Sequence, residues 1–131
     1  MKKIIYIIFI TLLLTCGCSK KQTNTFKDTI RVSTSENIIK NQTIDNIFIS
    51  NVSLIYEDKS STFTCDITNN SDNAQYIKEI KIHIKTKKGR DIIVLSGYVD
   101  NTILPSETYS ISSSYTLDLT KAYSVEYEIV R

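Results

Sequence analysis

The sequence predicts a small all-β protein, and two observations support this fold class. Ala occurs only at positions 74 and 122, whereas β-branched and aromatic residues, which suit a pleated surface, are plentiful. Apolar and polar side chains also alternate with a period of two, most clearly at Ile80, Ile82 and Ile84. A helix would space its apolar residues three and four apart, so this pattern predicts half-buried strands.

Six segments follow this pattern and are separated by turn-forming residues. The predicted strands are 46–56, 62–68, 77–86, 91–98, 109–117 and 123–129. In the first strand, Phe48, Val52, Leu54 and Tyr56 are expected on one face, and the continuous apolar run 92–95 suggests burial on both faces. Six or seven short strands separated by turns are typical of a single antiparallel two-sheet sandwich.

The first eighteen residues have the organisation of an export signal. Met1-Lys2-Lys3 is positive, residues 4–14 are apolar or nearly so, and Thr15-Cys16-Gly17-Cys18 ends the segment with small residues. Eleven residues are too few for a membrane-spanning helix, which needs about twenty. We therefore predict a cleaved signal peptide at residues 1–17 and a chain that is exported.

Leu14-Thr15-Cys16-Gly17-Cys18 resembles the lipobox of bacterial lipoproteins, in which a cysteine preceded by a small residue is lipidated. Gly17 supplies the small residue for Cys18, and Cys16 remains the alternative position. The resemblance implies a diacylglyceryl anchor on Cys18 and a location on the extracytoplasmic face of the cell membrane, as in Gram-positive-type cells.

Cys65 is the cysteine left after processing and lipidation, so no disulfide framework is expected. It lies in phase with Phe63 and Ile67, which predicts a small buried hydrophobe rather than a reactive thiol.

Residues 19–43 are polar and show no sustained apolar period. We predict that residues 18–43 form a flexible linker and that residues 44–131 form the domain. The linker would span about 25 to 30 Å. An edge strand within 26–32 or at Ile38 and Ile39 is the alternative.

The order of turns along the domain resembles small immunoglobulin-like domains of Gram-positive envelope proteins, the FxLYD type among them. The residues that carry the resemblance are Ile67-Thr68-Asn69-Asn70-Ser71-Asp72, Lys87-Lys88-Gly89-Arg90 and Pro105-Ser106-Glu107-Thr108. This resemblance implies an immunoglobulin-like sandwich. The spacing of Leu117, Leu119 and Tyr123 is similar to the tyrosine corner of fibronectin-type sandwiches, which implies a structural Tyr123.

Charge and glycine content argue against nucleotide and nucleic-acid functions. The chain has 16 Lys and Arg against 14 Asp and Glu, and removal of Lys2 and Lys3 leaves a balanced chain without the field that nucleic-acid binding needs. Beyond the signal peptide only Gly89 and Gly97 remain, so no glycine-rich phosphate loop exists.

A basic stripe on the predicted strand 77–86 is the main candidate for binding. Lys81, His83, Lys85 and Lys87 share one face and could meet an anionic wall polymer, anionic headgroups or a protein partner. The alternative is a solvated face on which Glu126 and Glu128 of a neighbouring strand pair with this charge.

The sequence offers little for catalysis or metal binding. His83 is the sole histidine, so a triad or a multi-histidine site is not expected. Asp66, Asn69, Asn70 and Asp72 could hold a hard cation, but they also form ordinary turns. We therefore expect a non-catalytic binding module without a cofactor. The alternative is a small envelope hydrolase or lytic accessory protein using Glu126 and Glu128, whose spacing of roughly 7 Å suits an inverting glycosidase.

Overall fold

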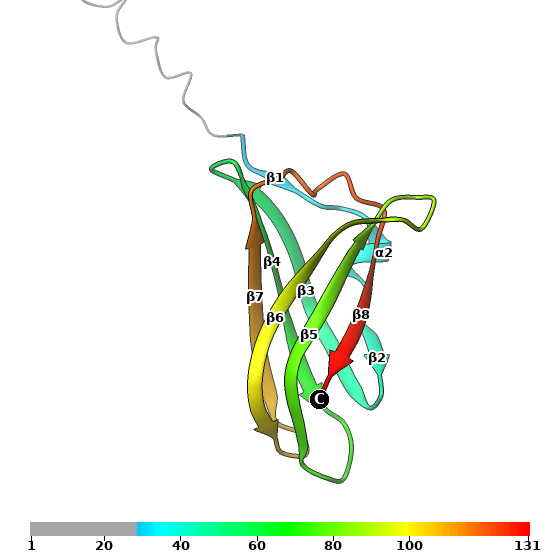
Figure 1. The fold of residues 1–131 in the computed structure, drawn as a ribbon, viewed down its shortest axis with the longest axis vertical. Helices are drawn as coiled ribbons and strands as arrows, with labels where there is room; N and C mark the ends of the chain where they lie inside the picture. The colour runs from blue at the N-terminus through cyan, green and yellow to red at the C-terminus, as the bar shows by residue number, and fades with distance from the viewer. Residues whose placement is uncertain (1–28) are drawn as a thin grey trace, which may run out of the picture.

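The structure is a computed structural model, in which residues 29–131 are described (Figure 1). The predictions for the signal peptide, Cys16 and Cys18 therefore lie outside the described residues. The described chain contains eight strands and one short helix. They are β1 (Arg31–Val32), α2 (Glu36–Ile39), β2 (Gln42–Ile44), β3 (Ile47–Glu57), β4 (Ser60–Asn69), β5 (Gln75–Lys85), β6 (Asp91–Ile103), β7 (Thr108–Tyr115) and β8 (Ser124–Val130).

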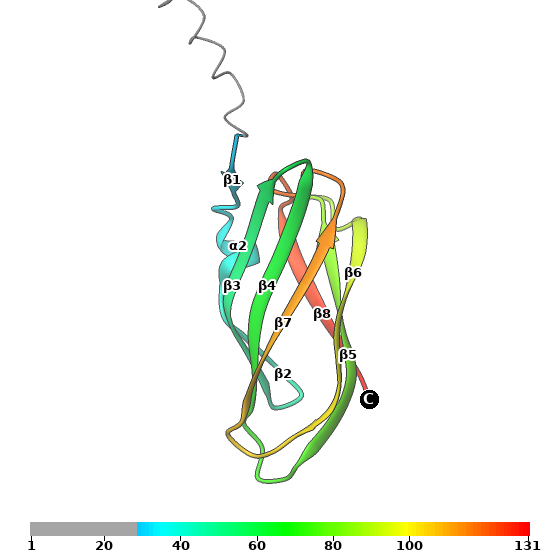
Figure 2. The ribbon, with the colours of Figure 1, turned by 90° about the vertical axis from the view of Figure 1, so that its left-hand side faces the viewer.

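These strands form two antiparallel sheets, which confirms the predicted all-β class. The first sheet has the order β1-β3-β4-β7, with β2 also pairing with β3, and the second has the order β6-β5-β8. In Figure 2 the two sheets are seen as two layers. The six longest strands, β3 to β8, correspond to the six predicted segments.

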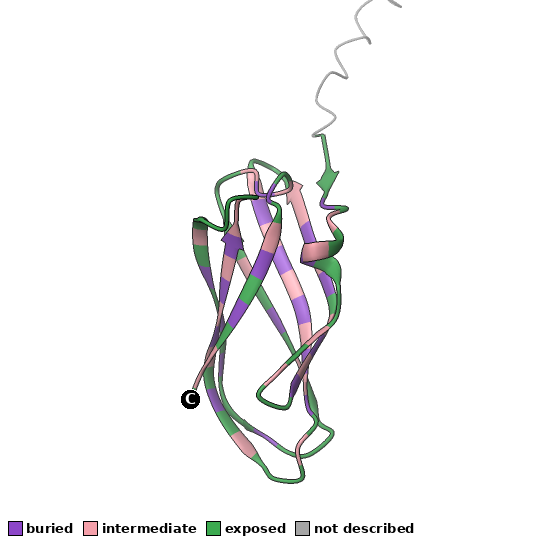
Figure 3. Ribbon diagram, turned by 90° about the vertical axis from the view of Figure 1, so that its right-hand side faces the viewer, coloured by how far each residue is buried: buried purple, intermediate pink, exposed green. Residues whose placement is uncertain are grey.

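The core lies between the sheets and is built by the predicted alternation. Phe63, Cys65 and Ile67 of β4 and the three isoleucines of β5 at 80, 82 and 84 are all buried, whereas the residues between them are partly exposed. Figure 3 shows this alternation as bands of buried residues along the strands. The rings of Phe63 and Tyr127 meet across the core with centroids 6.2 Å apart. All buried apolar side chains of the described chain lie between Ile38 and Tyr127.

A β-bulge in β3 changes the phase of its alternation. The register with β4 shifts between Ser50 and Ser53, and Asn51 has a positive φ of 51°. Consequently Ile47 and Ile49 point inward before the bulge, and Val52 and Leu54 point inward after it. The prediction that Phe48 shares the inward face of Val52 is wrong, because an extra residue on one strand reverses the faces that follow.

The prediction that the run 92–95 is buried on both faces is also wrong. Leu95 is buried, but Ile92 and Val94 are 39% and 43% exposed. These two side chains lie on the outer face of β6, which stands at the edge of the second sheet. No described element covers that face. Apolar composition alone was therefore a wrong indicator of burial for Ile92 and Val94.

The linker predicted at 18–43 is wrong for residues 31–43, which belong to the folded domain. β1 and β2 both pair with β3, and the backbone N–H of Ser33 donates to the carbonyl of Leu54 at 2.9 Å. Between them, α2 places Ile38 in the core with no exposed surface. The edge-strand alternative holds for Arg31 and Val32, whereas Ile38 and Ile39 are helical.

The side chain and backbone of Asn69 connect the loop between β4 and β5 to the turn between β6 and β7. Its buried side-chain amide donates to the carbonyls of Asn73 at 2.8 Å and Ile103 at 2.9 Å, and its side-chain oxygen accepts from the N–H of Ser71. The carbonyl of Asn69 also accepts from the N–H of Ser106 at 2.7 Å. One side chain thus joins the β4–β5 loop to the β6–β7 turn.

A pair of neighbouring isoleucines tests the corrected domain boundary. Ile38→Ala should lower the free energy of unfolding by about 2 to 5 kcal/mol, because it leaves a cavity in the core. Ile39→Ala is the matched control, since Ile39 is 38% exposed and should cost less than about 1 kcal/mol. Urea denaturation measures the free energy of unfolding of both variants. If the two changes had equal and small effects, residues 31–43 would have to be assigned to the linker after all.

Candidate functional site

The candidate site is the outer face of the second sheet, where three neighbouring strands present three kinds of side chain. β6 presents mainly apolar residues on either side of Ser96, β5 presents cations together with Glu79, and β8 presents carboxylates. In register, His83 lies between Val94 and Glu126, and Lys81 lies between Ser96 and Glu128. The same period of two that buries the isoleucines of β5 therefore aligns Lys81, His83 and Lys85 outside.

The charged side chains on this face form a connected group that we call the His83 cluster, comprising His83, Lys85, Asp91, Glu126 and Glu128. His83 Nδ1 lies 3.0 Å from Asp91 Oδ2, and His83 Nε2 lies 3.3 Å from Glu128 Oε2. Lys85 Nζ lies 3.1 Å from Glu126 Oε2 and 3.5 Å from Asp91 Oδ1. Asp91 is therefore shared by both cations.

These contacts shift the protonation equilibria toward the charged forms. The hydrogen bond with Asp91 is the main cause that raises the pKa of His83, and the Glu128 carboxylate adds to it against partial desolvation. The same contact with His83 lowers the pKa of Asp91. The pKa of Lys85 is raised chiefly by its hydrogen bond to Glu126. When both ring nitrogens of His83 carry protons, each can donate to a carboxylate.

Two of the four residues of the basic stripe, His83 and Lys85, are paired within the protein, in part with Glu128 and Glu126 as the alternative interpretation of the sequence expected. Lys85 has a side chain only 17% exposed and contacts two carboxylates. Lys81 forms no ion pair with any residue in the described range, although Glu128 lies opposite it in register. Lys87 lies in the turn after β5, away from the sheet face.

Glu126 and Glu128 occupy open positions. Their side chains are 68% and 55% exposed, and each contacts a cation of β5. A general acid of a glycosidase needs a sheltered carboxyl group with a raised pKa, and this face provides no shelter for either side chain.

Cys65 is a buried core residue, as predicted. It is 2% exposed, and burial, followed by the nearby charge of Asp66, raises its pKa to about 12. A thiol with so high a pKa is a poor nucleophile at neutral pH.

Two of the residues considered for a hard cation, Asp66 and Asn69, point to opposite sides of β4, and Asn70 and Asp72 lie in the loop that follows it. Asp66 lies on the outer face, where Asn51 and Ser110 donate to it at 2.8 and 2.6 Å, whereas Asn69 is buried. Among residues 29–131 no group of three or more metal-binding side chains was found.

The tyrosine-corner prediction for Tyr123 is wrong. Its side chain is half exposed, and the hydrogen bonds described for it are made by its backbone: its N–H donates to Lys85 and its carbonyl accepts from Ser35 Oγ. Leu119 and Ala122 are the buried residues of this connection, and the N–H of Leu119 donates to Ser61 Oγ at 2.9 Å.

The apolar row on β6, made of Ile92, Val94 and Tyr98, is the feature that sequence reasoning missed. Tyr98 is 69% exposed and lies opposite Glu79 of β5, whereas Val94 lies opposite His83. The available signal was the apolar run itself, which was assigned to the core because runs of this kind are usually buried in strands.

Comparisons with protein-family models, with curated proteins and with solved structures each found no match. Within residues 29–131, no helix has the length and apolar character needed to cross a membrane.

A pH titration tests the His83 cluster. NMR of the His83 ring should give a pKa above the usual 6.5, and Asp91→Asn should lower it toward that value, because the main stabilising partner loses its charge. Protonated His83 then stabilises the fold fully below pH 6.5, and this contribution is lost as the pH rises through the raised folded-state pKa.

His83→Gln should abolish this part of the pH dependence of the free energy of unfolding. Lys81→Gln is the matched control, because Lys81 lies on the same row without an ion pair in the described chain. A His83 pKa at or below 6.5, or an Asp91→Asn variant that leaves this pKa unchanged, would contradict the contacts of His83 with Asp91 and Glu128.

Proposed function

We propose that this chain is an extracytoplasmic lipoprotein, anchored to the cell membrane by a diacylglyceryl group on Cys18, that serves as a non-catalytic binding module. The support for the anchor is the resemblance of Leu14-Thr15-Cys16-Gly17-Cys18 to a lipobox, behind a positive start and a short apolar run. The support for a binding role is the small all-β domain that follows, with paired charges and exposed apolar side chains on one face.

The strand order supports an immunoglobulin-like arrangement for this domain. Counted from β3, the first, second and fifth strands share one sheet, and the third, fourth and sixth share the other. In immunoglobulin domains strands A, B and E likewise share a sheet, C and F share the other, and C′ of variable-type domains pairs with C as β6 pairs with β5.

The observation that carries the binding role is the apolar row Ile92, Val94 and Tyr98 on β6. Exposed apolar side chains grouped on one strand face gain free energy when a partner covers them. The neighbouring cations are held in place by Asp91, Glu126 and Glu128, so the charged rim is ordered before a partner arrives. An apolar strip beside an ordered polar rim is the composition of a protein-binding surface.

Labelling with a palmitate analogue tests the anchor. In cells that express the full chain, the label should attach to the protein, and Cys18→Ser should remove it. Cys16→Ser is the matched control and should retain the label, as should Cys65→Ser, because Cys65 is buried. If the label is lost with Cys16→Ser and kept with Cys18→Ser, the anchor is on Cys16. If the unaltered chain takes up no label, the proposed lipid anchor is wrong.

Site-specific photocrosslinking tests the binding face. A photoreactive residue in place of Val94 should give a discrete covalent adduct in intact cells, and adding Tyr98→Lys should reduce the adduct at least about tenfold, because a charge replaces an apolar contact. The control places the same photoreactive residue at Ser112, an exposed position of β7 that lies opposite Thr64 in the first sheet. Equal adducts from both positions, or none from Val94, would contradict a binding role for this face.

A further inference from the structure

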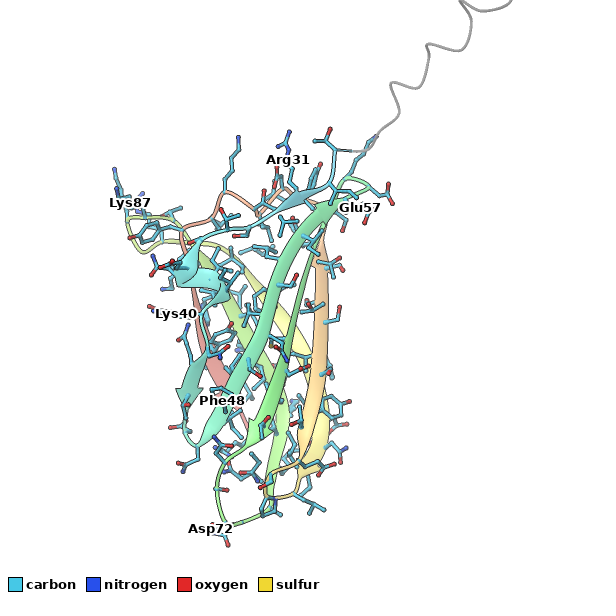
Figure 4. The ribbon with its side chains drawn as sticks, turned by 180° about the vertical axis from the view of Figure 1, so that it is seen from behind. Arg31, Lys40, Phe48, Glu57, Asp72 and Lys87 are labelled. Atoms are coloured by element: carbon cyan, nitrogen blue, oxygen red, sulfur yellow. The ribbon has the colours of Figure 1, made fainter. Side chains whose placement is uncertain are left out.

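The turns at one end of the domain form a surface that we call the basic end, made of residues 29–32, 58–59, 86–90 and 116–123. The register brings them together, because β1 pairs with the end of β3, Tyr115 lies opposite Ser61, and Ser124 lies opposite Lys85. Figure 4 shows Arg31 and Lys87 at this end and Asp72 at the opposite end of the long axis.

Charge is distributed unequally between the two ends. The basic end carries six cations and two acids, of which Asp118 is paired with Arg31 at 2.7 Å. The cations are Arg31, Lys59, Lys87, Lys88, Arg90 and Lys121. The turns at the opposite end, 45–46, 70–74 and 104–107, carry Asp45, Asp72 and Glu107 and no Lys or Arg. The turns are thus polarised in charge along the length of the domain, although Glu57 and Asp91 flank the basic end and Arg131 contacts Gln75 near the opposite end.

Exposed apolar side chains gather at the same basic end. Ile30, Val32, Leu117 and Tyr123 are between 45% and 57% exposed, whereas the opposite turns expose one large apolar side chain, Leu104. The basic end also contains a surface pocket lined by Thr29, Arg31, Tyr56, Asp58 and Lys59, in which two cations, one carboxylate and a phenol meet.

We propose that the basic end contacts the anionic headgroup layer of a lipid bilayer. Lys and Arg side chains are attracted to the negative surface of such a layer, and Ile, Leu and Tyr side chains enter its headgroup region favourably. A soluble anionic polymer would satisfy the cations and leave the apolar side chains in water. The combination of both kinds of side chain on one end therefore favours a bilayer.

This contact gives the proposed lipoprotein an orientation, and in that respect it rests on the proposed function. The described chain begins at Thr29, which is part of the basic end, so a lipid anchor further upstream would attach on the same side. With the basic end on the membrane, the long axis of the domain stands away from it. The β6 face then remains open to a partner, and the acidic turns lie farthest from the lipid.

Vesicle sedimentation of residues 29–131 tests the proposal without a lipid anchor. This fragment retains every buried apolar side chain of the described core, and it lacks Lys20, Lys21 and Lys27, which would add their own charge. It should sediment with vesicles of equal parts phosphatidylglycerol and phosphatidylcholine, and much less with phosphatidylcholine alone. Raising the salt concentration to about 0.5 M should weaken the binding, because the attraction is screened.

Two variants should separate the charged and apolar contributions. The triple change Lys87→Glu, Lys88→Glu and Arg90→Glu should reduce the bound fraction at least about tenfold, and Leu117→Ser should reduce it several-fold, roughly as expected for loss of a buried apolar side chain. The matched control is Lys40→Glu, Lys78→Glu and Lys81→Glu, because it changes the charge by the same amount and all three lysines lie outside the basic end. Thermal unfolding of each variant verifies that it is folded.

The proposal is overturned if folded protein binds neutral and anionic vesicles equally, if the control variant loses as much binding as the triple variant, or if no vesicle binding occurs. Binding to soluble lipoteichoic or teichoic acid without binding to vesicles would assign the basic end to a wall polymer instead. None of these outcomes affects labelling of Cys18 or crosslinking at Val94, so the proposed function and this inference fail separately.

Discussion

The fold depends on the packing of two central strands, β4 and β5, through their apolar faces. Each is flanked on both sides within its own sheet, β4 by β3 and β7 and β5 by β6 and β8. Their inward side chains are fully buried or nearly so and fill the space between the sheets. Because side chains alternate along a strand wherever no bulge interrupts it, this packing also fixes which residues face outward. Which side chains lie on the outer surface is therefore a consequence of how the core side chains pack.

The His83 cluster illustrates this consequence. Burial of Ile82 and Ile84 aligns His83 and Lys85 on the outside, and burial of Val125 and Tyr127 does the same for Glu126 and Glu128 on β8. Antiparallel register then sets the two rows against each other, so opposite charges meet. The cluster satisfies most of its own charge, which leaves the apolar row on β6 as the part of this face with surface still to bury.

The central strands could be predicted from the sequence, whereas the edges could not. For Ile80, Ile82 and Ile84 the alternation is unbroken, because both faces of a central strand have a fixed environment. At the edge, Ile92 and Val94 are apolar without being buried, and nothing local distinguishes them from core residues. The bulge at Asn51 reverses faces without a strong residue signal, and the segments around Ile38 are too short to show any period. Part of the His83 cluster could be predicted, because the pairing of the basic residues of β5 with Glu126 and Glu128 follows from the alternation. The contribution of Asp91 could not, because this residue lies at the very start of β6.

The polarity of the two ends is hidden in the composition but present in the order of the turns. Strands that run alternately up and down deliver successive turns to alternate ends of a sandwich. Here the turns 45–46, 70–74 and 104–107 fall at one end, and 58–59, 86–90 and 116–123 fall at the other. Every Lys and Arg of these six turns belongs to the second set, so their charges add at one end while the total stays near zero. A net charge near zero therefore does not exclude a membrane-facing surface in an antiparallel domain. The topology decides at which end the charges of each turn are placed.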